Sequence, residues 1–181
     1  LDWDWKKTNY NRIALVNLLL ATKGTDCSYL EIGCCENNLF DAVPVKNKVG
    51  VDPNLGGNFR GTSDEFFAQN KQKFDIIFID GLHTYEQVHK DINNALKVLK
   101  KGGFIGLHDM IPRDWKEHHV PIVSDKAWTG DPWKTAYEII NTAGIDFKIL
   151  KIDHGVGVLR IAGDQTPQLK DMSSTLDRQN Y

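Results

Sequence analysis

Two apolar runs separated by one helical pattern constrain the fold of this chain most. Residues 76–79 form a short, continuous apolar run, and residues 104–107 form another. Runs of this kind are typical of strands buried on both faces of a parallel sheet. Between them, apolar residues recur on one helical face over residues 88–99, and Gly102-Gly103 is predicted to end that helix. The sequence therefore predicts a βαβ unit with parallel strands and a right-handed crossover.

Four ionisable side chains follow these two predicted strands directly. Asp80 and His83 follow the first strand, and His108 and Asp109 follow the second. The carboxyl ends of parallel strands meet at one edge of a sheet, which is where ligands of open α/β sheets bind. We therefore expect the four side chains to converge and to form the candidate site.

Three helix starts carry capping signals. Thr62 with Glu65, and Thr84 with Gln87, each have the spacing of a capping box, in which a hydroxyl and an acid or amide satisfy backbone N–H groups reciprocally. Asp131-Pro132 predicts a further start, with a capping acid followed by proline at the first helical position. Helices are expected to begin at these three places.

The remaining patterns complete an alternating α/β fold. A closing hairpin is predicted from residues 147–152 and 156–161, turning at Asp153-His154-Gly155. We predict an α/β fold with a doubly wound, mostly parallel seven-stranded sheet that ends in this antiparallel hairpin. Residues 1–162 are expected to form a single domain, and residues 163–181 a polar C-terminal tail. The other predicted strands are 28–32, 48–51 and 58–60.

Charge and cysteine content limit the class of partner. The chain of 181 residues has a formal net charge of −2, so bulk charge attracts it neither to nucleic acid nor to an anionic membrane. The longest apolar run, residues 13–21, is broken by Asn17 and is too short to span a bilayer. Three cysteines, two of them adjacent, do not make a disulfide framework. We predict a cytoplasmic protein with no nucleic-acid or membrane partner, and an exposed sheet edge leaves a homo-oligomer open.

Two short segments carry a family resemblance. Residues 79–86 read Ile-Asp-Gly-Leu-His-Thr-Tyr-Glu, and residues 130–134 read Gly-Asp-Pro-Trp-Lys. In these segments, and in the order of its elements over residues 28–161, the chain resembles the class I S-adenosylmethionine-dependent methyltransferases. The particular branch has Ile-Asp-Gly-x-His-x-Tyr-Glu after strand four and is related to metal-assisted O-methyltransferases of small molecules and sugars. The resemblance implies S-adenosylmethionine as cofactor and a small-molecule or saccharide acceptor.

The resemblance implies a cofactor site at the ends of the first strands. Gly33 matches the first motif, where the chain turns tightly beneath the cofactor, and Asp52 would accept the ribose hydroxyls. Residues 62–64 match the adenine-side segment, for which a plain helix cap is the alternative. The family usually has glycines where this chain has Cys35 and Asn37. The implied cofactor residues are Glu31, Gly33, Cys34, Asp52, Thr62, Ser63 and Asp80.

The resemblance places the chemistry at the ends of strands four and five. In the related metal-dependent enzymes an acid ends strand four and an acid pair ends strand five, positions matched by Asp80, His108 and Asp109. Two carboxylates with one imidazole suit manganese, iron, nickel or zinc better than magnesium. Three interpretations stay open: a divalent metal held by these three residues, metal-free catalysis with His108 or His83 as base, and a structural network. The catalytic candidates are His108, His83 and Asp80.

These observations predict an S-adenosylmethionine-dependent methyltransferase that acts on a hydroxyl oxygen of a small molecule or sugar. One alternative is an NAD-type oxidoreductase, although no G-x-G-x-x-G fingerprint follows the first strand. The other is a non-catalytic cofactor-binding domain with a degenerate first motif, which Cys35 and Asn37 keep open.

Overall fold

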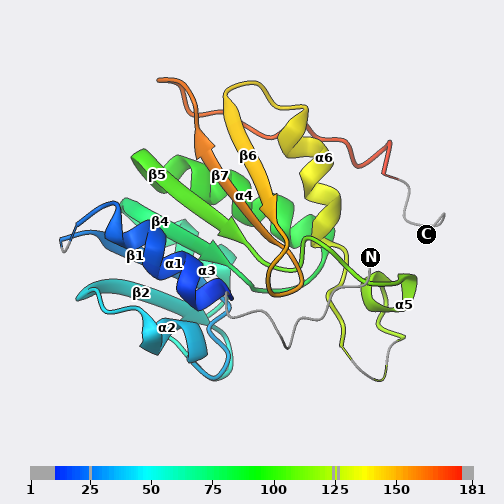
Figure 1. Cartoon of the computed structure of the whole chain (residues 1–181), viewed down its shortest axis with the longest axis horizontal. Helices are drawn as coiled ribbons and strands as arrows, with labels where there is room; N and C mark the ends of the chain where they lie inside the picture. The colour runs from blue at the N-terminus through cyan, green and yellow to red at the C-terminus, as the bar shows by residue number, and fades with distance from the viewer. Residues whose placement is uncertain (1–10, 25, 124, 126, 177–181) are drawn as a thin grey trace.

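A seven-stranded sheet forms the middle layer of the molecule (Figure 1). The computed structural model describes residues 11–24, 26–123, 125 and 127–176, so residues 1–10 of the predicted domain and 177–181 of the predicted tail lie outside the described residues. The strand order is β3-β2-β1-β4-β5-β7-β6, with β7 antiparallel to both β5 and β6 and the other pairs parallel. This confirms the predicted fold class. The strands are β1 (Ser28–Ile32), β2 (Asn47–Asp52), β3 (Phe59–Arg60), β4 (Phe74–Ile79), β5 (Leu99–Leu107), β6 (Ile145–Leu150) and β7 (Val156–Ile161).

Helices cover both faces of the sheet, and β4 supplies both cores. Ile76 and Phe78 of β4 pack in the cluster that includes α1 and α2, whereas Ile77 and Ile79 pack in the cluster beneath α3, α4 and α6. This alternation follows from the two-residue period of a strand. Figure 1 shows α1 on one side of the sheet and α4 on the other. The helices are α1 (Arg12–Ala21), α2 (Asn38–Ala42), α3 (Ser63–Gln69), α4 (Tyr85–Val98), α5 (Trp115–His118), the 3₁₀ turn η2 (Pro132–Lys134) and α6 (Thr135–Ile140).

One of the two predicted capping boxes forms and the other does not. At α3, the Thr62 hydroxyl accepts the Glu65 N–H and the Glu65 carboxylate accepts the Thr62 N–H. At α4, Thr84 makes no side-chain cap bond; instead the Tyr85 N–H donates to Asp131 Oδ1 at 2.6 Å. Asp131 makes no cap bond to its own helix start. The predicted box at Thr84 was wrong because the Thr84 N–H, which the Gln87 side chain would accept, donates to the Leu82 carbonyl oxygen instead. Gln87 makes other contacts.

The boundaries of α4, β5 and β6 differ from the predicted ones. Helix α4 ends at Val98, before Gly102-Gly103, and β5 begins at Leu99 with a register shift opposite residues 74–76 of β4. Gly102 has φ +74 within this strand, so the glycine pair accommodates an irregular strand and does not stop the helix. In the hairpin, β6 begins at Ile145, two residues before the predicted start.

The segment after β7 returns across the helical layer. The Leu169 N–H donates to Asn93 Oδ1 of α4, and the Met172 N–H donates to Glu138 Oε1 of α6. Leu169 belongs to the core beneath these helices, and Leu176 is also buried. Residues 163–176, which belong to the predicted polar tail, therefore pack against the domain. Among the described helices, none combines the length and apolar character needed to cross a bilayer.

Candidate active site

A cavity of about 520 Å³ lies at the carboxyl ends of β1, β2 and β4. This volume falls in the range of small-molecule and cofactor sites. Five of the seven predicted cofactor residues line it, and Gln87 of α4 and residues 81–83 complete the wall towards the end of β4. Glu31 and Cys34 do not line it. The five residues are Gly33, Asp52, Thr62, Ser63 and Asp80.

The loop after β1 keeps the backbone of a glycine-rich turn with fewer glycines. Gly33 has φ +85, and a Cβ at this position would lie 2.1 Å from the Asp80 carbonyl oxygen. Cys35 and Asn37 have φ values of 46 and 64, in the left-handed region that glycine adopts most easily. The Cys35 N–H donates to Asp52 Oδ2, and Asn37 Oδ1 accepts the Gly57 N–H. The two departures from the family pattern therefore retain the turn.

Asp52 is held as a carboxylate by the backbone around it. Its Oδ1 accepts the N–H groups of Asn54 and Leu55, and its Oδ2 accepts that of Cys35. Burial acts to raise the pKa of Asp52, but these N–H groups and Arg60 outweigh it, so the pKa lies below its usual value. A fixed carboxylate at the end of β2 is suited to accept hydroxyl groups.

Glu31 and Cys34 lie beneath the loop and away from the cavity. The Tyr29 hydroxyl donates to Glu31 Oε2 at 2.6 Å, and the Cys34 Sγ lies 3.9 Å from the Glu31 carbonyl oxygen. Burial raises the pKa of Glu31 to about 7 and that of the Cys34 thiol well above its usual value. Their contacts are those of residues that support the loop, and direct cofactor contact by either stays a prediction.

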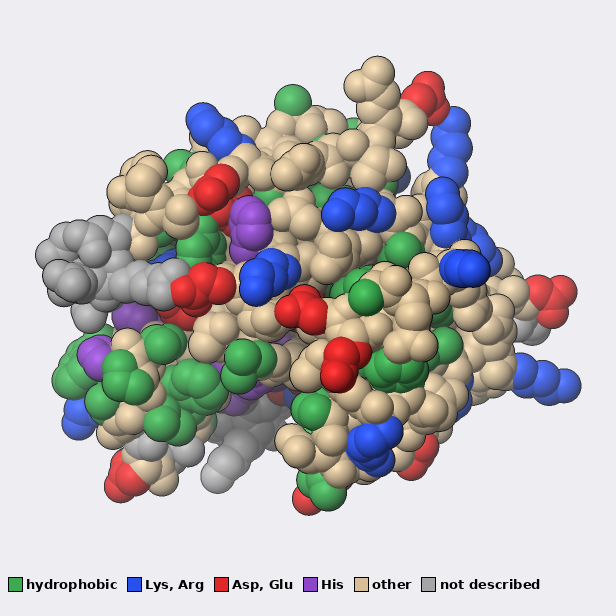
Figure 2. All heavy atoms as spheres, turned by 180° about the vertical axis from the view of Figure 1, so that it is seen from behind, with side chains coloured by type: hydrophobic (Ala, Val, Ile, Leu, Met, Phe, Trp, Pro, Cys, Tyr) green, Lys and Arg blue, Asp and Glu red, His purple; other side chains and the backbone are tan. Residues whose placement is uncertain are grey.

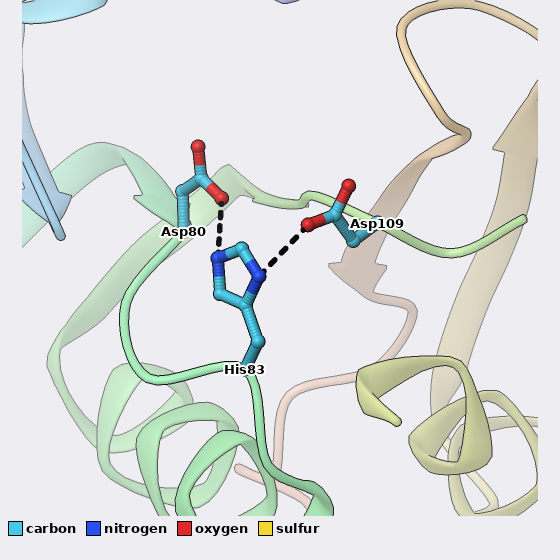
Figure 3. Close-up of side chains that lie close together, drawn as sticks. All are labelled: Asp80, His83 and Asp109. Carbon is cyan, nitrogen blue, oxygen red and sulfur yellow. Dashed lines mark ion pairs between the residues drawn. The ribbon is translucent and has the colours of Figure 1, made fainter. Parts of the chain in front are cut away.

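The four ionisable residues that follow β4 and β5 lie together. Ile79 and Leu107, the last residues of these parallel strands, are paired, so Asp80 and His108 leave the sheet side by side. His83 lies between two carboxylates, with Nε2 3.4 Å from Asp80 Oδ1 and Nδ1 3.1 Å from Asp109 Oδ2 (Figure 3). The Nδ1 of His108 lies 3.1 Å from Asp80 Oδ1 and 3.2 Å from Asp109 Oδ1.

The cluster contains a set of atoms suited to a metal ion. One ligand atom each from Asp80, His83 and Asp109 lie within 4.8 Å of one another. The Nδ1 of His83 is buried and makes no hydrogen bond among the described residues, despite its proximity to Asp109. A buried imidazole nitrogen that makes no hydrogen bond is suited to bind a metal ion. This grouping contains His83 where the sequence analysis named His108, whose role as a ligand stays a prediction.

The carboxylates and imidazoles of the cluster shift each other's pKa. Burial acts to raise the pKa of Asp80, but His108 and His83 lower it well below its usual range. Burial acts to lower the pKa of His108, but Asp80, Asp109 and Asp153 together raise it well above its usual value. The carboxylates and the His108 imidazole therefore favour each other's charged form.

Two further residues of this cluster escaped the sequence analysis. Arg12, at the start of α1, donates from NH1 to Asp153 Oδ2 at 2.6 Å, and its Nε lies 3.9 Å from Asp80 Oδ2. Asp153 stands in the β6–β7 turn, 3.7 Å from His108 Nε2. The antiparallel pairing of β7 with β5 was a usable signal, because it brings this turn to the end of β5. Nothing in the local sequence around Arg12 signals its contact.

Trp128 and Gly130, in the segment between β5 and η2, pack against His83 of the cluster. The Trp128 ring stacks on His83, with centroids 5.7 Å apart and planes at 20°. Gly130 has φ +64, and a Cβ there would lie 1.8 Å from the His83 carbonyl oxygen, so the segment closes tightly on His83. Figure 2, seen from behind, shows hydrophobic side chains and histidines gathered at the end of the molecule that carries α5. The exposed apolar residues of this segment are Trp115, Val120, Ile122 and Val123.

Known proteins resemble the chain in sequence and in fold. Residues 45–110 match the family model of a methyltransferase domain. An uncharacterized protein, R132, of Acanthamoeba polyphaga mimivirus is 26% identical, over 61% of this chain and 63% of its own length. The chain thus spans less than two thirds of that relative.

Solved structures share the fold at low identity. The methyltransferase PaMTH1 of Podospora anserina, bound to S-adenosylhomocysteine, is 16% identical with a TM-score of 0.62, over 83% of this chain and 77% of its own. The O-methyltransferase TomG of Streptomyces achromogenes, in complex with S-adenosylmethionine, is 13% identical with a TM-score of 0.61, over 82% and 78%. Residues 45–110 thus match a methyltransferase domain, and the chain shares the fold of these S-adenosylmethionine- and S-adenosylhomocysteine-bound methyltransferases.

Proposed function

We propose that this chain transfers a methyl group from S-adenosylmethionine to a hydroxyl oxygen of a small molecule or sugar. The observation that carries the proposal is a cofactor-sized cavity that runs from Asp52 and Ser63 to Asp80 and His83. One end offers groups for a nucleoside, and the other meets the carboxylate–imidazole cluster. The cofactor-bound states of TomG and PaMTH1 support the choice of cofactor.

Residues of this chain would hold the cofactor along the cavity. Gly33 admits the backbone turn beneath the methionine part, and the Asp52 carboxylate would accept the ribose hydroxyls. Ser63 and Thr62 stand at the opposite wall, at the start of α3. The bound sulfonium supplies the methyl group, and the protein aligns it with the acceptor oxygen.

On the acceptor side, the charges favour metal assistance over an unassisted histidine base. A general base must be free to take a proton, whereas the carboxylates around His108 raise its pKa and so favour its protonated form. The pKa of His83 is also raised, since burial, which lowers it, is outweighed by Asp80 and Asp109. A divalent metal held by Asp80, His83 and Asp109 would lower the pKa of the acceptor hydroxyl. His108, bonded to Asp80, would then orient that carboxylate.

The surroundings of the cluster support a small acceptor with an apolar or sugar face. Trp128 stacks on His83, and Trp115 and Ile122 are exposed in the same segment. Aromatic faces of this kind pack against rings and sugars. The non-catalytic alternative loses support because Cys35 and Asn37 retain the turn of the first motif.

Calorimetric titration with S-adenosylhomocysteine tests the cofactor. We expect micromolar affinity for the wild-type protein, no binding of NAD, and at least a tenfold loss of affinity in Asp52→Asn. Asp164→Asn is the matched control, because Asp164 is an exposed acid that pairs with Lys101 far from the cavity. Absence of S-adenosylhomocysteine binding by the wild type would overturn the proposal.

A second titration tests the metal. Manganese should bind the wild type and should bind Asp109→Asn at least tenfold more weakly, because one of the carboxylates of the grouping is lost. Equal manganese binding by both proteins would remove the metal from the proposal and leave the cofactor assignment standing.

A further inference from the structure

The side chain of Gln87 in α4 does not cap the helix and makes other polar contacts. Its Nε2 donates to Ser63 Oγ at 3.1 Å, to Asp64 Oδ1 at 3.3 Å and to Asp91 Oδ1 at 3.2 Å. Gln87 and Ser63 both line the cavity. The contacts therefore tie the first turns of α4 to the start of α3, where the family resemblance places the adenine side of the cofactor.

The partners fix which end of the amide faces them. Asp64 and Asp91 present carboxylate oxygens, which accept hydrogen bonds, so the NH₂ group must point towards them and the carbonyl oxygen away. Among the described residues, the Oε1 of Gln87 accepts no hydrogen bond, and the side chain is half-buried. A lone amide oxygen is thus left on a residue of the cavity wall.

Asp91 holds this orientation from inside the protein. It is fully buried, and a Cβ on the cavity-lining Gly81 would lie 3.9 Å from its Oδ2. Burial raises the pKa of Asp91 to about 6, while hydrogen bonds from Ser63 and Gln87 lower it. Reversing the Gln87 amide would set its carbonyl oxygen against this buried carboxylate, which is strongly unfavourable. The orientation is therefore determined before any ligand binds.

An outward amide oxygen discriminates between purine bases. The 6-position of adenine carries an amino group, which donates hydrogen bonds, whereas hypoxanthine carries an oxygen there, which accepts them. A site that presents an acceptor pairs with the first and leaves two acceptors opposed with the second. We propose that Gln87 reads the 6-amino group of the cofactor adenine through Oε1, with Asp91 as the residue that positions it. This inference rests on the proposed function.

The bridge from α4 to α3 could instead serve packing alone. In that case, loss of the Gln87 amide would lower stability or affinity for every ligand by a similar factor. Only if Gln87 accepts a hydrogen bond from the base does the ratio of affinities for the two bases depend on residue 87. The ratio is therefore the decisive quantity.

The experiment compares S-adenosylhomocysteine with S-inosylhomocysteine by calorimetric titration on the wild type, Gln87→Met and Gln69→Met. Methionine keeps the length of glutamine and removes the amide. Gln69 is the matched control, because it is exposed on the neighbouring α3 and donates to the Glu65 carbonyl oxygen. We expect the wild type to prefer the adenosyl compound, Gln87→Met to reduce that preference about tenfold, and Gln69→Met to leave it unchanged.

A second variant examines the positioning role. In Asp91→Asn the new amide can pair with Gln87 in either orientation, so the preference should fall while the adenosyl compound still binds; thermal unfolding checks that the variant folds. An unchanged preference in Gln87→Met, with S-adenosylhomocysteine bound, would overturn this inference alone. Failure of the wild type to bind S-adenosylhomocysteine would overturn the proposed function and this inference together.

Discussion

The two halves of the site are built from different materials. The cofactor half, residues 31–64, is shaped by backbone groups: positive φ values at Gly33 and Cys35, and N–H groups that surround Asp52. The acceptor half is a cluster of ionisable side chains drawn from across the chain, from Arg12 to Asp153. Altering a turn should disrupt the whole of a site that backbone groups form. In a site that charged side chains form, each substitution should change one contribution. The acceptor half consists of Arg12, Asp80, His83, His108, Asp109 and Asp153.

The largest effect should come from Gly33→Ala, which tests the backbone half. The new Cβ would lie 2.1 Å from the Asp80 carbonyl oxygen, so the turn must move. We expect a loss of about 3 kcal/mol or more in the free energy of unfolding, together with loss of S-adenosylhomocysteine binding. Gly144→Ala is the matched control: φ there is +83 with nothing within 4 Å, so strain alone should cost about 1 kcal/mol. Equal losses in denaturant unfolding would contradict the steric account.

Within the cofactor half, the buried carboxyl of Glu31 should make the free energy of unfolding depend on pH. Burial raises its pKa from 4.5 to about 7, so the folded state keeps a proton that the unfolded state has lost. The stability this gives is fully present below pH 4.5 and is lost as pH rises to about 7. Relative to Glu31→Gln, the wild type should lose on the order of 1–3 kcal/mol across that window. Denaturant unfolding at several pH values measures this, and a constant difference would show that Glu31 does not titrate there.

Asp153→Asn should weaken the acceptor half and leave the cofactor half unchanged. The variant loses the ion pair with Arg12, both side chains being less than a third exposed, which should cost about 1 kcal/mol of stability. Turnover should fall, while affinity for S-adenosylhomocysteine stays within about twofold, because Asp153 does not line the cavity. Asp146→Asn, which breaks the exposed pair with Arg160 in the same hairpin, should change stability little. A parallel loss of cofactor affinity would mean that the two halves are coupled.

The smallest effect is expected at Cys35→Gly. Glycine adopts the left-handed conformation without strain, so we expect a gain of up to about 1 kcal/mol and unchanged cofactor affinity. Asn37→Gly should gain nothing, because asparagine tolerates this conformation and its Oδ1 accepts the Gly57 N–H. Denaturant unfolding of both variants makes the comparison, and a loss of stability in Cys35→Gly would show that the thiol contributes more than strain removes.

Sequence reasoning succeeded where the signal is local. The capping box of Thr62 and Glu65, the strand at residues 28–32 and the convergence at the ends of β4 and β5 follow from neighbouring residues and parallel topology. It failed where another group competes for the same partner. The Leu82 carbonyl oxygen took the Thr84 N–H group that Gln87 was expected to accept, and Arg12 reached the cluster through packing that no spacing encodes.

The return of residues 163–176 across the helices bears on how this domain can be cut and expressed. Glu138 is fully buried and accepts hydrogen bonds from both Tyr85 and the Met172 N–H, and Leu169 fills part of the core beneath α4. A chain shortened to end at residue 162 would open that core to water and remove one donor from a buried carboxylate. We therefore expect a truncated protein to keep full stability only when it extends to about Leu176.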